Sequence, residues 1–232
     1  MVIKIFGDSH TSALKGALKE SYVDSNVRLD VQWLKLGKFG DVDFEEALEQ
    51  VKELESNDLL VISIWGTLHN VFGLLKQDPP FSFYAEKLEG PGELIPTNTL
   101  KTLFRNKIES NKRVIELIKA ANCKVVHLST PPPKGDQAFL LELASRKSTK
   151  YRDMEINSDS LNSPSYRLGL WKFEMEILAS CLATHDVELM EVPVETVDKD
   201  GFLKSEFYDM DFTHANIAYG KEVIKMLEGF YK

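Results

Sequence analysis

The chain has 232 residues, a formal net charge of −8, 43% hydrophobic residues and 28% charged residues. This balance is typical of a globular protein and excludes a chain that is disordered as a whole. A chain of this length can form one sizeable core, so we expect a single domain over residues 1–232. The acidic balance argues against nucleic acid or an anionic membrane as a partner, because both bind concentrated basic surfaces.

The two cysteines, Cys123 and Cys181, stand among apolar residues, which predicts buried free thiols rather than a disulfide. The amino terminus opens directly on a strand pattern and lacks the charged and apolar regions of a secretion signal. No apolar run reaches the roughly 20 residues of a membrane span. We therefore expect a soluble, cytoplasmic protein, and the sequence leaves its oligomeric state open.

The first ten residues contain an apolar run that stops abruptly at Gly7-Asp8-Ser9. This pattern predicts a buried strand that ends in a tight turn and delivers Ser9 to the start of a helix. Gly7 can adopt a positive φ, and Asp8 and Ser9 are favourable helix N-cap residues. Ser9 is then expected at the positive end of a helix dipole, which suits either the oxyanion of an acylated serine or a bound phosphate.

Strand and helix patterns alternate along the rest of the chain. Apolar runs and alternation predict further strands over 27–34, 59–64, 123–129 and 187–192. Helical spacing predicts helices over 10–21, 44–54, 98–121, 138–144 and 166–185, followed by a last helix that opens in the 209–220 block. Two segments interrupt this order, near 77–97 and near 145–165.

The segment near 77–97 is rich in proline and glycine and contains Phe81, Phe83 and Tyr84. It predicts a long ordered loop rather than a linker, and its aromatic residues suggest a lid or a substrate wall. The polar segment near 145–165 stands before the penultimate helix. From that position it could overhang a site.

The alternation, without an internal repeat or a break in composition, predicts a three-layer α/β/α sandwich with a mostly parallel, five-stranded sheet. In an open sheet of this kind, sites lie beyond the carboxyl ends of the strands. That rule brings Ser9, the 37–40 loop, the 66–70 loop and the loop at Pro131 toward one crevice.

Asp211 and His214 stand three residues apart at the start of the last predicted helix. A serine nucleophile needs a neutral imidazole to take its proton and a carboxylate that fixes the tautomer of that imidazole. An Asp-x-x-His pair also occurs where both residues merely cap a helix. Taken alone, the pair leaves the catalytic and the capping interpretations open.

Gly7-Asp8-Ser9-His10 at the end of the first strand, together with Asp211-Phe-Thr-His214 near the carboxyl terminus, resembles the GDSL/SGNH hydrolase superfamily. The resemblance implies a flavodoxin-like sandwich and an ester hydrolase, with Ser9 as nucleophile, His214 as general base and Asp211 as the acid that orients it. It also implies an oxyanion hole made by the Ser9 amide, a glycine amide after the second strand and a side chain after the third.

For the glycine of the oxyanion hole we expect Gly40, with Gly37 as the alternative. The third block of the superfamily usually reads Gly-x-Asn, whereas this chain has Gly66-Thr67-Leu68, so the asparagine is absent. Asn70, one helical turn beyond Gly66, or the hydroxyl of Thr67 could donate instead. Since one oxyanion donor contributes on the order of 10²–10³ in rate, this departure affects the expected rate more than the mechanism.

Two further residues are candidates for lining the substrate. His69 is expected either to line the crevice or to cap a helix after the third strand. Trp65 could stack on a sugar or an acyl chain. The spacing of the histidines and cysteines matches no metal-binding pattern, and Gly7-Asp8-Ser9 lacks the lysine of a phosphate-binding loop, so we expect neither a metal nor a cofactor.

The expected partner is a small-molecule or carbohydrate ester, and the resemblance makes a small acyl group, such as acetyl on a carbohydrate, the first candidate. Two alternatives stay open. The same three residues could pass the acyl group to an acceptor hydroxyl, as in an O-acyltransferase. The missing asparagine would also suit a binding protein that has kept the fold and lost the rate.

Overall fold

A computed structural model of the chain describes residues 1–20, 27–35, 38–83, 92–146 and 156–229. Its main sheet has the strand order β2-β1-β3-β6-β7, and each neighbouring pair is parallel. These strands are β1 (Val2–Gly7), β2 (Arg28–Trp33), β3 (Leu59–Ser63), β6 (Lys124–Leu128) and β7 (Glu188–Met190). The expected α/β fold with a five-stranded parallel sheet is confirmed.

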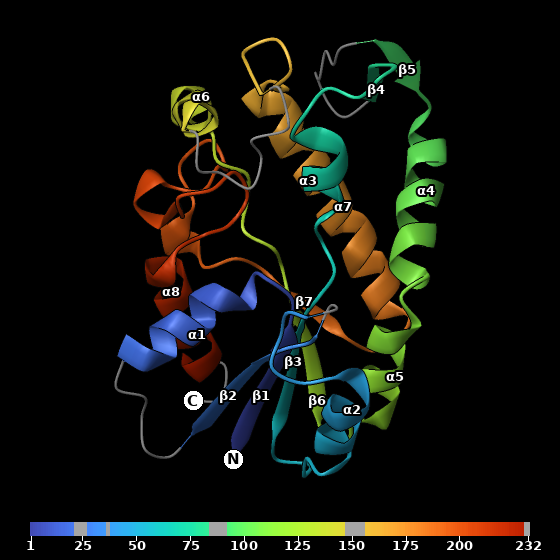
Figure 1. Cartoon of the computed structure of the whole chain (residues 1–232). Coiled ribbons are helices and arrows are strands. Elements are labelled where there is room, and N and C mark those ends of the chain that lie inside the picture. Colours follow the sequence, from blue (N-terminus) through green and yellow to red (C-terminus); the bar gives the residue numbers. More distant parts are fainter. Residues whose placement is uncertain (21–26, 36–37, 84–91, 147–155, 230–232) are drawn as a thin grey trace.

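Helices flank both faces of this sheet, and further elements stand above the carboxyl ends of its strands (Figure 1). The helices are α1 (Thr11–Glu20), α2 (Phe44–Lys52), α3 (Leu68–Gly73), α4 (Thr97–Glu109), α5 (Lys112–Ala120), α6 (Gln137–Ser145), α7 (Pro164–Ala183) and α8 (Ile217–Gly229), with the short 3₁₀ helices η1 (Val194–Thr196) and η2 (Ser205–Phe207). No helix of the described ranges combines the length and the apolar character of a membrane span.

The apolar side chains of the central strands pack into two separate hydrophobic cores, one on each face of the sheet. Ile5 of β1 and Val61 of β3 pack with the inner side chains of α1 and α8. Phe6 and Ile62, the next residues along each strand, pack with side chains of α2, α5 and α7 on the opposite face. Successive side chains of a strand point to opposite faces, so a strand covered on both sides is apolar at nearly every position. This explains why neither strand shows alternation.

The first and last helices touch through glycine. A Cβ atom at Gly220 of α8 would lie 2.2 Å from the carbonyl oxygen of Ala13 in α1, and one at Gly16 would lie 2.7 Å from Ile217. Only residues without a side chain allow the two backbones to approach this closely. The contact brings the loop that precedes α8 next to the turn that precedes α1.

The expectation of one helix over 98–121 is wrong, because α4 ends at Glu109 and α5 begins at Lys112. Asn111, with φ −84° and ψ 81°, leaves the helical region, and the Ser110 hydroxyl donates to the carbonyl of Lys107. Serine and asparagine form such local hydrogen bonds readily and therefore favour helix ends.

The expectation of a long loop near 77–97 is also wrong in part. β4 (Phe81–Phe83) and β5 (Glu93–Ile95) form a parallel two-stranded sheet. Phe83 is fully buried, and its ring lies 5.4 Å from that of Tyr166 and 5.6 Å from that of Phe173, between centroids, so it belongs to the core and not to a substrate wall. Tyr84 lies outside the described residues, as do residues 147–155 of the second segment.

Candidate active site

Ser9 lies in the turn between β1 and α1. A Cβ atom at Gly7 would lie 2.2 Å from Cγ2 of Thr11 and 2.7 Å from the carbonyl oxygen of Ser63, so close packing requires glycine here. Gly7 does not use its freedom to adopt a positive φ, since it is not among the described residues with one. The Asp8 carboxylate accepts the N–H of His10 at 3.1 Å and thereby fixes the turn.

His214 and Asp211 lie in the loop before α8 and meet Ser9 across the α1–α8 contact. Asp211 Oδ1 accepts the N–H groups of His214 at 2.7 Å and of Thr213 at 2.9 Å, while Oδ2 bonds to His214 Nδ1. Nε2 of the same imidazole lies 2.8 Å from Oγ of Ser9, a residue 205 positions away. A carboxylate on Nδ1 holds the proton there, which leaves Nε2 free to accept the serine proton.

The ionisation of the Asp211 carboxyl fits this geometry. Burial raises its pKa, but the hydrogen bonds and the charge of His214 outweigh burial and hold the pKa well below its usual range. Asp8 behaves in the opposite way, because burial raises its pKa to about 6 despite the His10 N–H. Asp211 is therefore ionised at neutral pH, as an orienting acid requires.

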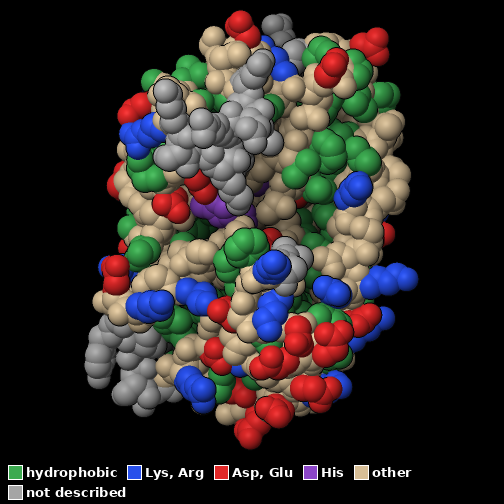
Figure 2. Space-filling model, in the orientation of Figure 1, with side chains coloured by type: hydrophobic (Ala, Val, Ile, Leu, Met, Phe, Trp, Pro, Cys, Tyr) green, Lys and Arg blue, Asp and Glu red, His purple; other side chains and the backbone are tan. Residues whose placement is uncertain are grey.

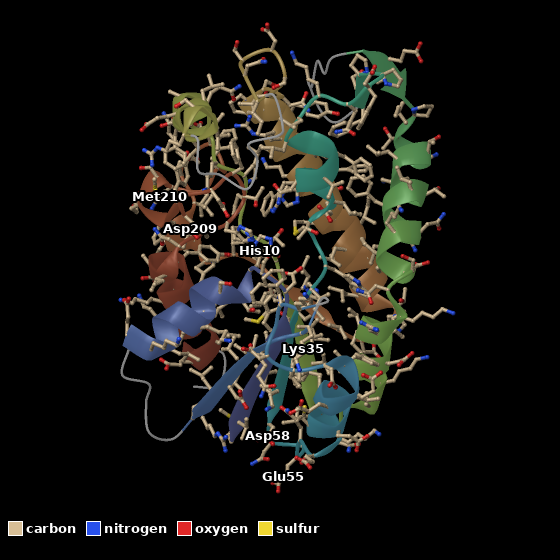
Figure 3. The ribbon with its side chains drawn as sticks, in the orientation of Figure 1. His10, Lys35, Glu55, Asp58, Asp209 and Met210 are labelled. Atoms are coloured by element: carbon tan, nitrogen blue, oxygen red, sulfur yellow. The ribbon has the colours of Figure 1, made fainter. Side chains whose placement is uncertain are left out.

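His10, the residue after Ser9, packs against His214 with ring centroids 4.8 Å apart. Figure 3 labels His10 at the head of α1 beside the loop of Asp209 and Met210. Burial, together with the charges of His214 and His69, lowers the pKa of His10 to about 3. His10 is thus a neutral neighbour of the imidazole that faces Ser9.

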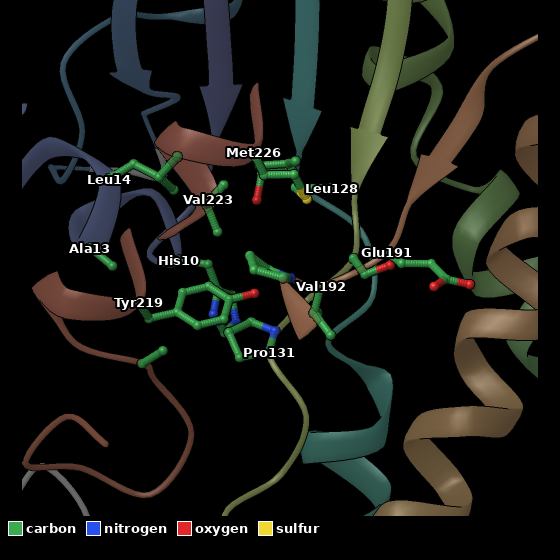
Figure 4. Close-up of a pocket in the computed structure, with 14 residues that line it drawn as sticks. His10, Ala13, Leu14, Leu128, Pro131, Glu191, Val192, Tyr219, Val223 and Met226 are labelled. Atoms are coloured by element: carbon green, nitrogen blue, oxygen red, sulfur yellow. The ribbon is translucent and has the colours of Figure 1, made fainter. Parts of the chain in front are cut away.

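A small cavity adjoins His10 on the side of α8. Its volume is about 20 Å³, and Figure 4 shows His10, Pro131 and Tyr219 around it. A space of this size holds about one water molecule. The cavity is therefore too small for a substrate. Histidine side chains, in purple, are visible in the middle of the face shown in Figure 2.

A second imidazole–carboxylate pair is buried nearby. His69 of α3 is 2% exposed, Glu174 of α7 is 0% exposed, and His69 Nδ1 lies 2.8 Å from Oε2 of Glu174. The same carboxylate accepts the N–H groups of Leu68 at 2.9 Å and of His69 at 2.7 Å. His69 thus lies near the crevice, as its effect on His10 indicates, but is locked to α7 rather than exposed along a wall.

The residues expected in the oxyanion hole lie in different parts of the fold. Gly40, with φ +121°, packs against the backbone of Lys35, where a Cβ atom would lie 2.6 Å from Cα. Thr67 precedes α3 without capping it through its hydroxyl, and the Asn70 side chain makes no hydrogen bond to any described residue. Gly37, the alternative glycine, lies outside the described residues.

Trp65 has a different role from the expected one. It is 7% exposed, and its indole stacks on the His127 ring with centroids 6.0 Å apart. Its backbone N–H also points to Nε2 of His127, at 3.4 Å. The interpretation of Trp65 as a stacking surface for substrate is wrong here, because the ring belongs to the core.

The fold and the site define an α/β protein with hydrogen-bonded serine, histidine and aspartate side chains at the carboxyl edge of a parallel sheet. Within the described ranges, no group of three or more histidine, cysteine, aspartate or glutamate residues could hold a metal ion.

No protein-family model matches the sequence, and no curated protein matches it. Solved structures similar to the chain include an extracellular lipase from Streptomyces rimosus, with 12% identity, a TM-score of 0.49, and 99% of each chain covered. A GDSL-like lipase from Bacteroides thetaiotaomicron has 13% identity and a TM-score of 0.48, over 99% of this chain and 87% of that one. A carbohydrate acetylesterase family member from Sinorhizobium meliloti has 12% identity and a TM-score of 0.44, over 99% and 96%.

Proposed function

We propose that the protein is a single-domain ester hydrolase of the GDSL/SGNH type that acts through an acyl-enzyme on Ser9. The observation that carries the proposal is the hydrogen-bonded chain from Asp211 through His214 to Ser9, with 2.8 Å between His214 Nε2 and Ser9 Oγ. These three hydrogen-bonded side chains lie beyond the carboxyl ends of the strands, where open α/β sheets hold their ligands.

In the first half of the proposed reaction, Ser9 Oγ attacks the ester carbonyl carbon while His214 Nε2 takes the serine proton. The tetrahedral intermediate collapses when His214 returns that proton to the leaving alcohol, which gives the acyl-enzyme. Water then attacks the acyl carbon, His214 takes its proton, and the acid leaves as Ser9 is restored. Asp211 stays ionised throughout and stabilises the imidazolium.

The oxyanion would form beside the amino end of α1. The Ser9 N–H finds no acceptor among the described residues, so it is available as one donor. Gly40, Thr67 and Asn70 remain the proposed further donors.

The proposed substrate is a small acyl ester, with O-acetyl on a carbohydrate as the first candidate. The choice of substrate depends on the family resemblance of the two end blocks, whereas the proposed chemistry depends on the geometry. Transfer of the acyl group to an added sugar, at a rate above that of hydrolysis, would identify an O-acyltransferase instead.

Hydrolysis of p-nitrophenyl acetate tests the mechanism. Ser9→Ala and His214→Ala should each lose activity by on the order of 10³-fold or more, because members of such a triad act as a unit. Ser12→Ala, at an exposed serine in the first turn of α1, and His185→Ala, just after α7, are matched controls and should keep the parent rate. Equal rates for all five proteins would sink the proposal.

Covalent labelling separates an active enzyme from a binding protein that kept the fold. A fluorophosphonate probe should add one equivalent to the parent protein, and peptide mass analysis should locate it on Ser9. His214→Ala should label far more slowly, because the serine has lost its base. An unlabelled parent protein would favour the inactive binding protein.

A further inference from the structure

Lys134 is a buried lysine that contacts the loop that carries Asp211. The residue is 2% exposed, and its Nζ donates to the backbone carbonyl oxygens of Asp209, at 2.6 Å, and of Asp211. The same Nζ lies 3.7 Å from the carboxylate oxygen Oδ1 of Asp211. One ammonium group thus contacts both the backbone and the side chain of this loop.

Aromatic rings and backbone contacts also hold Lys134 in place. The rings of Phe139 and Tyr208 each lie with their centroid 5.3 Å from Nζ, within the range of a cation–π contact. The backbone carbonyl of Lys134 accepts Nη2 of Arg167 at 2.9 Å, and Lys134 pairs with Leu203 in an isolated β-bridge. The position of the cation is therefore determined by several elements at once.

A buried ammonium group is unfavourable unless it is paired. Burial lowers the pKa of Lys134 to about 8, although the charges of Asp211 and Asp209 favour its protonated form. Within the part of the chain that the structure describes, Lys134 also contacts Arg167, whose guanidinium bonds the Lys134 backbone, and Tyr208. Lys134 is cationic at neutral pH and loses its charge as the pH rises through about 8.

We propose that Lys134 is a positioning residue of this site: its ammonium group fixes the loop of Asp211 and offsets part of the charge that Asp211 presents to His214. The inference rests on the proposed function, since it assigns Lys134 a role through the aspartate of the triad. Lys134 itself touches neither the serine nor the imidazole in any described contact.

The effect of the Lys134 charge on the protonation of His214 has a direction that can be measured. The negative charge of Asp211 favours the imidazolium form of His214, and a cation beside Asp211 opposes that effect. Besides Asp211, the titratable groups of the described residues that face His214 are His10 and Asp8, both from the turn before α1. Without the Lys134 charge, His214 should therefore protonate at a higher pH.

The test is an NMR titration of the imidazole signals, with His214 assigned by the signal that His214→Ala loses. In Lys134→Met, the His214 midpoint should move up by about one pH unit, the size of effect that one neighbouring charge has on a titrating group. The acidic limb of kcat/KM should move by the same amount, because hydrolysis needs the neutral imidazole. A residue that only supported the loop would lower kcat without moving that limb.

Two variants serve as controls. Lys134→Arg keeps a positive charge and should restore the midpoint of the parent protein. Lys4→Met removes another buried lysine, 8% exposed and paired with Asp30 in the sheet, and should cost stability without moving the midpoint. Should Lys134→Met fail to fold, the parent protein alone is informative, because its His214 signal should show a second inflection near pH 8 as Lys134 loses its proton.

The outcomes for the two proposals are distinct. A His214 midpoint that is the same in Lys134→Met and in the parent protein, or a parent titration without the inflection near pH 8, overturns the role of Lys134 even where hydrolysis depends on Ser9. Equal hydrolysis by the parent protein and Ser9→Ala overturns the proposed function, whereas the titration still decides whether Lys134 acts on His214.

Discussion

Glu174→Gln removes one negative charge from the buried contact between α7 and α3. The carboxylate is 0% exposed and accepts the N–H of Leu68 at 2.9 Å, the N–H of His69 at 2.7 Å and Nδ1 of His69 at 2.8 Å. A glutamine side chain offers one carbonyl oxygen and one NH₂ group. If the oxygen stays with His69, the NH₂ group faces the N–H of Leu68, and a buried donor loses its acceptor.

The loss of stability expected for Glu174→Gln follows from these contacts. A buried donor without an acceptor costs about 1–3 kcal/mol, and the two remaining hydrogen bonds lose their charge assistance. We expect Glu174→Gln to lower the free energy of unfolding by about 3 kcal/mol. In a protein of this length 1 kcal/mol corresponds to about 2–4 °C, so the Tm should fall by about 6–12 °C.

Thermal unfolding followed by circular dichroism at pH 7 measures this change. The matched control is Glu142→Gln on α6, which removes a surface ion pair with Arg146 at a side chain that is 63% exposed. Exposed pairs contribute about 0–1 kcal/mol, so the control should stay within about 4 °C of the parent protein. A Glu174→Gln protein that melts together with the control would refute the reasoning, because the carboxylate would then not be holding α3 to α7.

Three further changes probe the site and its frame. Asp211→Asn should lower kcat/KM for p-nitrophenyl acetate by on the order of 10⁴, since an amide no longer fixes the tautomer of the imidazole. Burial raises the pKa of Asp8 from 3.8 to about 6, so folding becomes less favourable as the pH rises through this window. Asp8→Asn should therefore stabilise the protein at pH 7 by up to about 3 kcal/mol and change little at pH 3, as urea unfolding at the two pH values would report. Gly220→Ala should cost about 2 kcal/mol and at least tenfold in rate, because its Cβ would lie 2.2 Å from the α1 backbone, whereas Gly229→Ala, with no described atom within 4 Å of its Cβ, should match the parent protein in the same assays.

The sheet could be predicted because its signal is local. The runs of β1 and β3 are almost continuously apolar, with Lys4 as the exception inside β1, and that pattern identifies strands covered on both faces wherever they occur. The three-residue strands β4 and β5 have no such signal. Their pairing depends on contacts such as that of Phe83 with Tyr166, a residue far along the chain, and neither composition nor periodicity reports it.

The site shows the same division between local and distant signals. Ser9, Asp211 and His214 could be singled out because residue type and spacing state the chemistry they can perform. Glu174 could also be singled out from the sequence, because it is a lone carboxylate on the apolar face of its helix. A carboxylate buried there requires a partner. Lys134 could not be singled out, because its partners stand 75 and 77 positions further along the chain.

The distance between Ser9 and His214 is determined by neither of the two motifs that contain them. Each motif fixes its own residue locally, through the packing of Gly7 on one side and the hydrogen bonds of Asp211 on the other. What joins them is the close approach of α1 and α8 at Gly220, on one face of the sheet only. Substitutions in that helix pair should therefore change the rate without touching a reacting atom, whereas equally buried substitutions on the opposite face should act on stability first.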